Sequence, residues 1–266
     1  MEWHGAEYAQ HSGHHRAFDD WFLERHRPFG SDVVVDLGCG SGEFSARLAS
    51  MLPEGRVIGV DPDESMLASA ARHAAPNLEF RRGTAEDLGE VVAPGSADVV
   101  VSRAMLHWMP FERYLRCFEA VREALRPGGV FHSESAGAGN VSGIVALVDT
   151  ISSEHGLPVL DAFPDPGQVL EDLERAGLEV GADGVRTVAQ RRPFTREELV
   201  GVLRTQAAVA LQRRAPAWEA ERLVDEVVAR ADRLRRHDGT FDQTFVRLEI
   251  LARRPGRPLG GASTAG

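Results

Sequence analysis

The chain has 266 residues, of which 43% are hydrophobic and 26% are charged, a composition typical of a globular protein with a full core and not of a disordered or collagen-like chain. Forty acidic residues against 30 basic ones give a net charge of -10, and all of those basic residues are arginines. The chain lacks the basic stripe that nucleic-acid binding requires, so we expect neither a nucleic-acid partner nor attachment to an anionic membrane.

The N-terminal stretch MEWHGAEYAQHSGHH has no basic start followed by an apolar segment, and the sequence has no run of 18 apolar residues. We therefore expect neither a signal peptide nor a membrane span. The two cysteines, Cys39 and Cys117, lack the spacing of a disulfide framework or a zinc site. These features predict a cytoplasmic protein without a metal centre, and they indicate no obligate protein partner.

Short hydrophobic runs alternate with helical segments from about residue 32 onward, the pattern of βαβ units on a parallel sheet. We expect strands at 33–37, 57–61, 78–81, 98–102 and 130–133. Helices are expected at 43–51, 65–74 and 111–125, the last ending in a turn at residues 126–129, Arg-Pro-Gly-Gly. This part of the chain is predicted to be a doubly wound half-fold.

The pattern changes after Glu134, where the loop AGAGNVSG precedes apolar residues at helical spacing between 144 and 151. Further helices are expected at 167–176 and 217–236, and strands at 185–188 and 245–251. Thr195 and Glu198 have the spacing of a capping box. Residues from Pro255 on have too little apolar content to pack.

The segment VVVDLGCGSGEFS combines a buried strand that ends near Asp36 with a glycine-rich turn and the start of a helix. Glycines permit positive φ and let a ligand approach the backbone closely. A glycine-rich turn alone is a weak signal, because any tight strand-to-helix turn can use glycine.

The next strand, VIGVD, ends at Asp61, about 20 residues further on, and its carboxylate can accept both hydrogen bonds of a ribose diol. An adenosine-type ligand is therefore expected. The glycine spacing is G-x-G-x-G and not the dinucleotide pattern G-x-G-x-x-G, and Asp36 and Glu43 bracket the turn. Two carboxylates repel a pyrophosphate but suit a ligand with an ammonium or sulfonium centre.

These segments resemble the class I S-adenosylmethionine (SAM) dependent methyltransferases, specifically the small-molecule group that includes trans-aconitate and juvenile hormone acid methyltransferases. The family's first four motifs are matched by VVVDLGCGSGEFS, VIGVDPDESML, RRGTAEDL and VVSRAMLHWMP. Later landmarks are matched by RPGGVF and FVRLEILARRP, so the resemblance covers about residues 8 to 254.

The resemblance implies an α/β, Rossmann-like fold with a doubly wound, mostly parallel seven-stranded sheet whose last strand is antiparallel. A helical lid is expected over the carboxyl edge of the sheet. The implied division is an N-terminal cofactor lid helix at 1–28, a methyltransferase domain at 29–254 with an acceptor lid inserted at about 136–243, and a disordered tail at 255–266.

The resemblance also implies which residues bind SAM. The methionine part would be held by Asp36 and by the backbone of Gly38, Cys39 and Gly40, and Asp61 would bind the ribose hydroxyls. Thr84 stands where the family usually has an acidic or amide residue, and Arg103 where it more often has Asn. The rest of the implied cofactor set is Tyr8, Pro62, Met66, Thr84, Ala85, Glu86, Ser102 and Arg103.

Methyl transfer from a sulfonium is an in-line displacement, so the protein must chiefly align the acceptor and exclude water. His107 and Trp108 directly follow the fourth strand, and the matching residues of the juvenile hormone acid enzymes line the acceptor pocket. Arg103 is a candidate to grip an acceptor carboxylate, and Gln10 would face the methionine end or the acceptor. The alternatives are packed structural roles for His107 and Trp108. For Arg103 the alternative is an outward salt bridge to Asp36, Glu43 or Glu134.

The predicted function is transfer of the methyl group of SAM to a small-molecule acceptor, favouring an oxygen of a small organic acid or secondary metabolite. Two alternatives stay open. One is a fold relative that binds SAM and catalyses a cyclisation or another reaction, because fold and cofactor site do not fix the reaction. The other is an NAD-dependent oxidoreductase, against which the glycine spacing and Asp36 argue.

Overall fold

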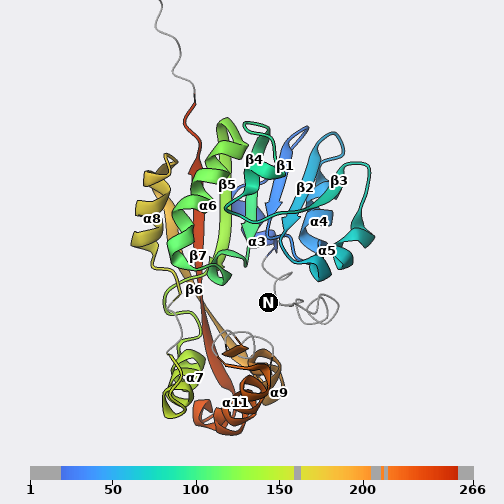
Figure 1. Ribbon diagram of the computed structural model, residues 1–266. Coiled ribbons are helices and arrows are strands. Elements are labelled where there is room, and N and C mark those ends of the chain that lie inside the picture. The colour runs from blue at the N-terminus through green and yellow to red at the C-terminus, as the bar shows by residue number, and fades with distance from the viewer. Residues whose placement is uncertain (1–18, 159–162, 205–210, 213–214, 257–266) are drawn as a thin grey trace, which may run out of the picture. The chain divides into compact units, whose positions relative to one another are not determined.

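Figure 1 shows a computed structural model that describes residues 19–158, 163–204, 211–212 and 215–256. The chain divides into two compact units. The sheet unit contains the described residues up to Ser135, Pro164–Arg186 and the residues from Leu248 on, and the helical unit contains Ala136–Phe163 and Thr187–Arg247. Residues 164–186, which lie within the insertion expected at 136–243, are part of the sheet unit in this division.

Seven strands form one sheet in the order β3-β2-β1-β4-β5-β7-β6. Their bounds are β1 (Val33–Leu37), β2 (Arg56–Asp61), β3 (Leu78–Arg82), β4 (Ala97–Arg103), β5 (Leu125–Ala136), β6 (Glu179–Phe194) and β7 (Phe241–Arg253). The first five pair in parallel. β7 is antiparallel to β5, since the Gly128 amide donates to the Arg254 carbonyl and the Arg254 amide donates to the Gly129 carbonyl. The predicted fold class is confirmed.

The described helices alternate with the strands as the sequence predicts. In the sheet unit they are α3 (Asp19–Arg25), α4 (Glu43–Met51), α5 (Glu64–Ala70), α6 (Tyr114–Ala124) and α8 (Pro166–Arg175), with short 3-10 helices at Ala71–His73, Leu88–Glu90, Leu106–Trp108 and Phe111–Arg113. In the helical unit they are α7 (Ser142–Glu154), α9 (Arg196–Val202), α11 (Ala217–Arg230) and the 3-10 helix Ala231–Leu234. The predicted capping box at Thr195 and Glu198 opens α9.

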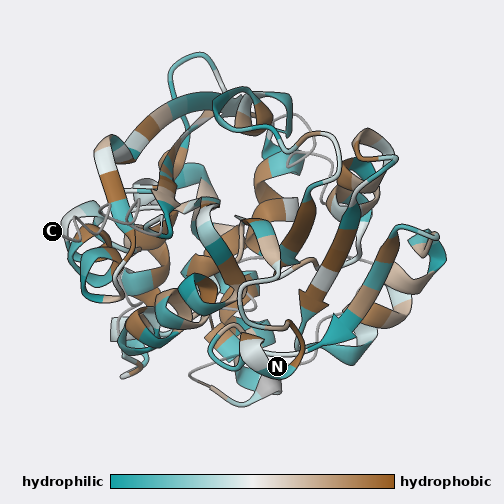
Figure 2. Cartoon of the chain, turned by 90° about the horizontal axis from the view of Figure 1, so that it is seen from above, coloured by the Kyte–Doolittle hydropathy of each residue, from teal (hydrophilic) through white to brown (hydrophobic). Residues whose placement is uncertain are grey.

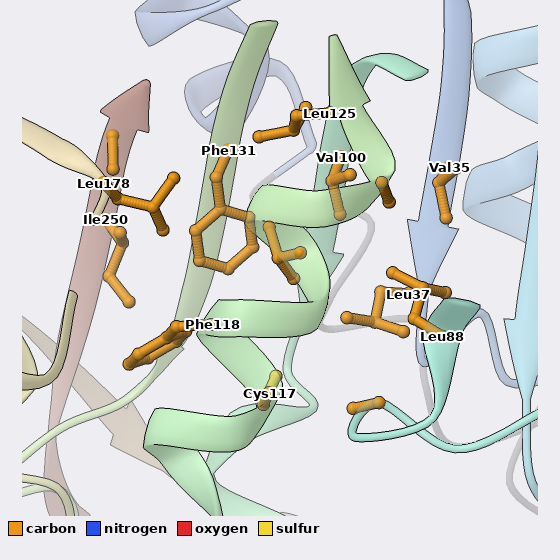
Figure 3. Close-up of a cluster of buried hydrophobic side chains, with 14 of the residues drawn as sticks. Val35, Leu37, Leu88, Val100, Cys117, Phe118, Leu125, Phe131, Leu178 and Ile250 are labelled. Carbon is orange, nitrogen blue, oxygen red and sulfur yellow. The ribbon is translucent and has the colours of Figure 1, made fainter. Parts of the chain in front are cut away.

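Hydrophobic layers cover both faces of the parallel strands. One layer joins the sheet to α6 and α8 and includes Leu37, Phe118 and Phe131 (Figure 3). The other joins the opposite face to α3 and α4 through Phe22 and Leu48. Strands buried on both faces are nearly continuously apolar, and the middle of the sheet is accordingly largely brown in Figure 2. The helical unit has a separate core built on α7 and α11.

Two strands are longer than the sequence predicts. β5 begins at Leu125, so the expected Arg-Pro-Gly-Gly turn is part of a strand that pairs with Arg254. β6 runs from Glu179 to Phe194 instead of over 185–188, and most of its residues are at least partly exposed. A strand that buries few side chains has little hydrophobic alternation from which to detect it.

Candidate functional site

The glycine loop, residues 38–42, connects β1 to α4 and is tied to the neighbouring strand β2. The amides of Gly38 and Cys39 donate to the carbonyl of Val60 at 2.8 and 3.1 Å. The amide of Gly40 donates to a carboxylate oxygen of Asp61 at 2.9 Å. The ends of β1 and β2 and the loop between β1 and α4 therefore form one connected structure at the carboxyl edge of the sheet.

The three glycines of the loop all have positive φ, but their surroundings differ. A Cβ at Gly38 would lie 2.3 Å from the Met105 side chain, and one at Gly42 would lie 2.8 Å from Phe80 and 2.9 Å from Ala70. A Cβ at Gly40, where φ is +53°, would meet nothing within 4 Å. Gly38 and Gly42 are thus required for packing, and Gly40 leaves its backbone open to a ligand.

Asp61 uses its carboxylate to order the two loops on either side of it. One oxygen accepts the Gly40 amide and the other accepts the Asp63 amide, both at 2.9 Å. Burial raises the pKa of Asp61, and these two backbone hydrogen bonds act in the opposite direction. A carboxylate has about four acceptor sites, so both oxygens keep capacity for the hydroxyls of a diol.

Asp36 is 2% exposed at the end of β1. The Ser45 hydroxyl donates to its carboxylate at 2.6 Å. Burial raises the pKa of Asp36 to about 6, although the Ser45 hydrogen bond and the charge of Arg103 lower it. The hydrogen bond and the positive charge near Asp36 offset only part of the cost of burying its negative charge. Such a carboxylate favours a cationic ligand.

Arg103 lies at the carboxyl end of β4 with its side chain 8% exposed. Its guanidinium pairs with Asp19 of α3 and lies 3.7 Å from a carboxylate oxygen of Glu134. Its central carbon is 5.2 Å from the centre of the Phe22 ring and 4.9 Å from that of Phe44. The salt bridge to Glu134 was one of the alternatives considered from the sequence, and the one to Asp19 was not.

The segment that follows β3 contains Thr84, Ala85 and Glu86, three residues of the cofactor set that the resemblance implies. Its Thr84 hydroxyl donates to the Asp87 carboxylate at 3.0 Å and accepts the Asp87 amide at 3.2 Å, so it caps the local turn. Glu86 pairs with Arg113 at 3.2 Å. Three further residues of the implied set differ in burial: Met66 is 4% and Ala85 is 9% exposed, and Pro62 lies at the surface.

His107 and Trp108 lie on the 3-10 turn that follows β4, with ring centroids 5.0 Å apart and both side chains partly buried. The turn is anchored at Leu106, which is fully buried and whose carbonyl accepts the Tyr114 hydroxyl at 2.8 Å. Ala104 enters it with φ of +51°. A non-glycine residue in that region costs energy and persists only where its surroundings hold it.

Several sequence-predicted site residues are brought together, and others are not described. The Gly40 amide is hydrogen-bonded to Asp61, and the charge of Arg103 lowers the pKa of Asp36. Ser102 is fully buried in β4. Tyr8, Gln10 and the N-terminal histidines lie outside the described residues. Within the described ranges, no group of three His, Cys, Asp or Glu side chains could hold a metal. No helix in those ranges has the length and apolar character to cross a bilayer.

Three residues that shape this site were not predicted from the sequence: Asp63, Ser45 and Asp19. Asp63 caps α5, and its amide donates to the Asp61 carboxylate. An Asp directly before a helix is a recognisable capping signal. Ser45 and Asp19 had no local signal, because each acts on a residue of a different element. Asp19 is 84 positions from its partner Arg103.

Comparison with known proteins identifies a domain within this chain. Residues 34–129 match the model of a family described as methyltransferase domain. The chain is 42% identical over 104 residues to a trans-aconitate 2-methyltransferase of Deinococcus radiodurans, a match that covers 39% of this chain and 37% of that relative. The chain thus spans little more than a third of the relative's length, and the matched domain contains every site residue from Asp36 to His107.

Solved structures share the fold over most of the chain. The YcgJ protein of Bacillus subtilis has a TM-score of 0.64 at 15% identity, covering 91% of this chain and 99% of that one. Phosphoethanolamine N-methyltransferase 2 of Haemonchus contortus, in complex with S-adenosylhomocysteine, has a TM-score of 0.59 at 18% identity. The match covers 95% of this chain and 57% of that one. The [4+2]-cyclase SpnF has a TM-score of 0.58 at 18% identity, and the match covers 90% of this chain and 81% of that one. At these identities the likeness concerns the fold alone.

Proposed function

We propose that this protein binds SAM at the glycine loop and transfers its methyl group to a small organic molecule. Residues 34–129 match a methyltransferase domain. The observation that carries the proposal is the joint placement of Gly40, Asp61 and Asp36 at one sheet edge. An open backbone, a diol acceptor and a buried carboxylate suit a nucleoside that carries a cationic amino-acid part.

The residues of the site have separate tasks in binding. Asp61 accepts the ribose hydroxyls with the oxygen capacity that its two backbone hydrogen bonds leave free. Asp36 interacts with the cationic end, where its charge is little screened because it is buried. SAM supplies an electrophilic methyl group when bound. His107 and Trp108 then orient the acceptor and exclude water, which is the main demand of an in-line displacement.

We propose a small organic acid, methylated on oxygen, as the acceptor. The support is that relatives matching the domain are trans-aconitate 2-methyltransferases. A carboxylate is already ionised at neutral pH, so its methylation needs no general base. With a phenol or an amine as acceptor, His107 would have to take the proton, and activity would fall as the pH drops through ~6.5.

A cyclisation catalyst is the second candidate, because a [4+2]-cyclase shares the fold. The two candidates differ in the fate of the methyl group. With labelled SAM and a panel of di- and tricarboxylic acids, the proposed function predicts label in the acceptor and stoichiometric formation of S-adenosylhomocysteine. Binding of SAM without turnover across acids, phenols and amines would favour the cyclase.

Binding itself is tested by calorimetry with SAM, S-adenosylhomocysteine and NAD. We expect the first two to bind and NAD not to bind. Asp61→Ala should weaken cofactor binding by about 2 kcal/mol, roughly 30-fold, through loss of charge-assisted hydrogen bonds. Glu64→Gln is the matched control, since it removes an exposed carboxylate only three residues away. Equal affinities of Asp61→Ala and wild type would remove Asp61 from the site.

A further inference from the structure

Four charged side chains form a network on the face of the sheet that carries α3 and α4, which we call the Arg103 cluster. Its members are Asp19, Arg47, Arg103 and Glu134. Arg103 pairs with Asp19 and approaches Glu134, and Arg47 lies 3.2 Å from Asp19. The side chains of Arg103 and Asp19 are 8% exposed and that of Glu134 is 1% exposed. Charges at this depth are stable only when they are paired.

The Arg103 cluster borders Asp36. Asp36 is in register with Val101 of β4, and alternate residues of a strand share a face, so Arg103 lies on the same face as Asp36 and two residues further along. Glu134 is the partner of Arg103 in β5. The Phe22 and Phe44 rings pack on the guanidinium, and a fixed charge in such apolar surroundings acts strongly on a neighbouring carboxylate.

We propose that Arg103 is a positioning residue of the cofactor site: it fastens α3 to the carboxyl ends of β4 and β5, and its charge keeps Asp36 ionised for a cationic ligand. The identity of that ligand rests on the proposed function. This role differs from the grip on an acceptor carboxylate that the sequence suggests for Arg103. In the structure the guanidinium already forms ion pairs with the carboxylates of Asp19 and Glu134. These ion pairs and the packing of the Phe22 ring hold it beside Asp36.

The groups that face Asp36 have opposite effects on its pKa. The Ser45 hydroxyl of α4 and Arg103 of β4 lower it, and the carboxylates of Asp61 and Asp19, from β2 and α3, raise it. Among the residues that the structure describes, the Cys39 thiol is a further titratable neighbour of Asp36. Burial raises its own pKa, so it adds no charge at neutral pH. Arg103 and Asp19 are partners in one ion pair and yet act on Asp36 in opposite directions. Replacing them singly therefore separates an electrostatic role from a structural one.

The first experiment follows the Asp36 carboxyl carbon by NMR in the ligand-free full chain. Arg103→Gln is expected to raise the pKa of Asp36 from about 6 by about one unit, and Asp19→Asn to lower it. Arg103→Lys keeps the charge and should leave the pKa near the wild-type value. Arg47→Gln is the matched control, because it removes the other cation beside Asp19 and leaves Arg103 in place.

Amide exchange in the same samples tests the fastening of α3. Exchange in α3 is expected to speed up at least tenfold in Arg103→Gln and in Arg103→Lys, because the lysine lacks the planar fork that bridges two carboxylates. Unchanged exchange in both variants would overturn this part of the proposal.

The second experiment measures SAM affinity across the same pH range. In Arg103→Gln the pH below which affinity declines should move upward with the pKa of Asp36, and affinity should recover at high pH to within about threefold of wild type. A loss that is equal at every pH, or shifts of the same sign in Arg103→Gln and Asp19→Asn, would overturn the charge role.

Two further outcomes are decisive. If Arg103→Gln does not fold, Asp19→Asn and Arg103→Lys carry the test, and an Asp36 pKa that is unchanged in folded Asp19→Asn contradicts the proposal. If wild type binds neither SAM nor S-adenosylhomocysteine, the proposed function fails, while the carboxyl titration still decides whether Arg103 keeps Asp36 ionised.

Discussion

Asp36 carries its charge at neutral pH at a cost to folding. Its pKa of about 6 in the folded chain lies above the usual value of about 3.9 for an unfolded Asp. Between these values the folded state binds more protons than the unfolded state, so the contribution of Asp36 to stability falls as the pH rises from about 4 to 6 and stays low above that. Ionisation of Asp36 thus opposes folding, and in the proposed function the same charge binds the cofactor.

Asp36→Asn should therefore stabilise the ligand-free protein at pH 7.5, by about 1 to 3 kcal/mol. The amide oxygen can still accept the Ser45 hydroxyl, so the hydrogen bond at this position is kept. Urea unfolding at pH 7.5 and near pH 4.5 is the measurement. The gain should shrink toward the lower pH, where the wild-type carboxyl is protonated in the folded state.

Glu64→Gln again provides the comparison, since Glu64 is 74% exposed. It should change stability little at either pH. A variant Asp36→Asn that is less stable than wild type at pH 7.5 would contradict the assigned pKa and its cause. If it is more stable and also binds SAM with undiminished affinity, Asp36 does not interact with the cationic part of the cofactor.

The site residues that sequence could predict are those with a local pattern. The glycine loop directly follows the buried strand β1, and Asp61 is the last residue of the buried strand β2. The end of such a strand can be recognised in the sequence as a hydrophobic run followed by a turn. The role proposed for Arg103 was not predictable, because it depends on Asp19, which reaches Arg103 from α3, 84 positions away in the chain. Such pairings depend on the tertiary arrangement and leave no spacing in the sequence.

The positions of the glycine loop differ in how much space they leave for a side chain. Gly42→Ala forces a side chain against Phe80 and Ala70 at a φ of +84° and should destabilise the chain by more than about 2 kcal/mol. Gly40→Ala meets open space at a φ of +53° and should cost about 1 kcal/mol of strain. Thermal unfolding separates the two.

Cofactor affinity gives the complementary readout. Gly40→Ala should fold and bind SAM at least tenfold more weakly, because the new methyl group occupies the approach to the loop backbone. Ser41→Ala in the same loop is the control, because it changes a side chain without changing the range of φ that the residue can adopt. Wild-type affinity in Gly40→Ala would move the ligand away from this part of the loop.

Element boundaries were predicted best where burial is complete. The bounds of β1 and α4 agree with the sequence prediction residue for residue, because their apolar pattern and the flanking glycines are local. β5 and β6 were predicted too short. The first part of β5 depends on pairing with Arg254, and the exposed β6 carries little hydrophobic pattern.

The net charge of -10 opposes the approach of the anionic acceptor that we propose. Added salt screens this repulsion, since the Debye length falls from ~30 Å at 0.01 M to ~10 Å at 0.1 M. KM for a tricarboxylate acceptor should therefore decrease severalfold over this range, with kcat little changed. The measurement is initial rates at two salt concentrations.

A neutral acceptor measured in parallel is the control, and its KM should not move. A KM for the tricarboxylate that rises with salt would mean that a local positive field outweighs the charge of the whole chain. Acceptor binding would then depend on arginines near the site and not on burial alone.

The sheet unit is discontinuous in sequence, and this has a consequence for synthesis. Its last contribution, from Leu248 on, follows the whole of the helical unit, and Leu248 and Ile250 are fully buried in the layer beside α6. A ribosome therefore releases the parallel strands well before the strand that completes them. Until then the edge of β5 and the apolar positions facing it are exposed, and exposed strand edges favour aggregation. The nascent chain thus has a period in which chaperone binding at that edge would protect it.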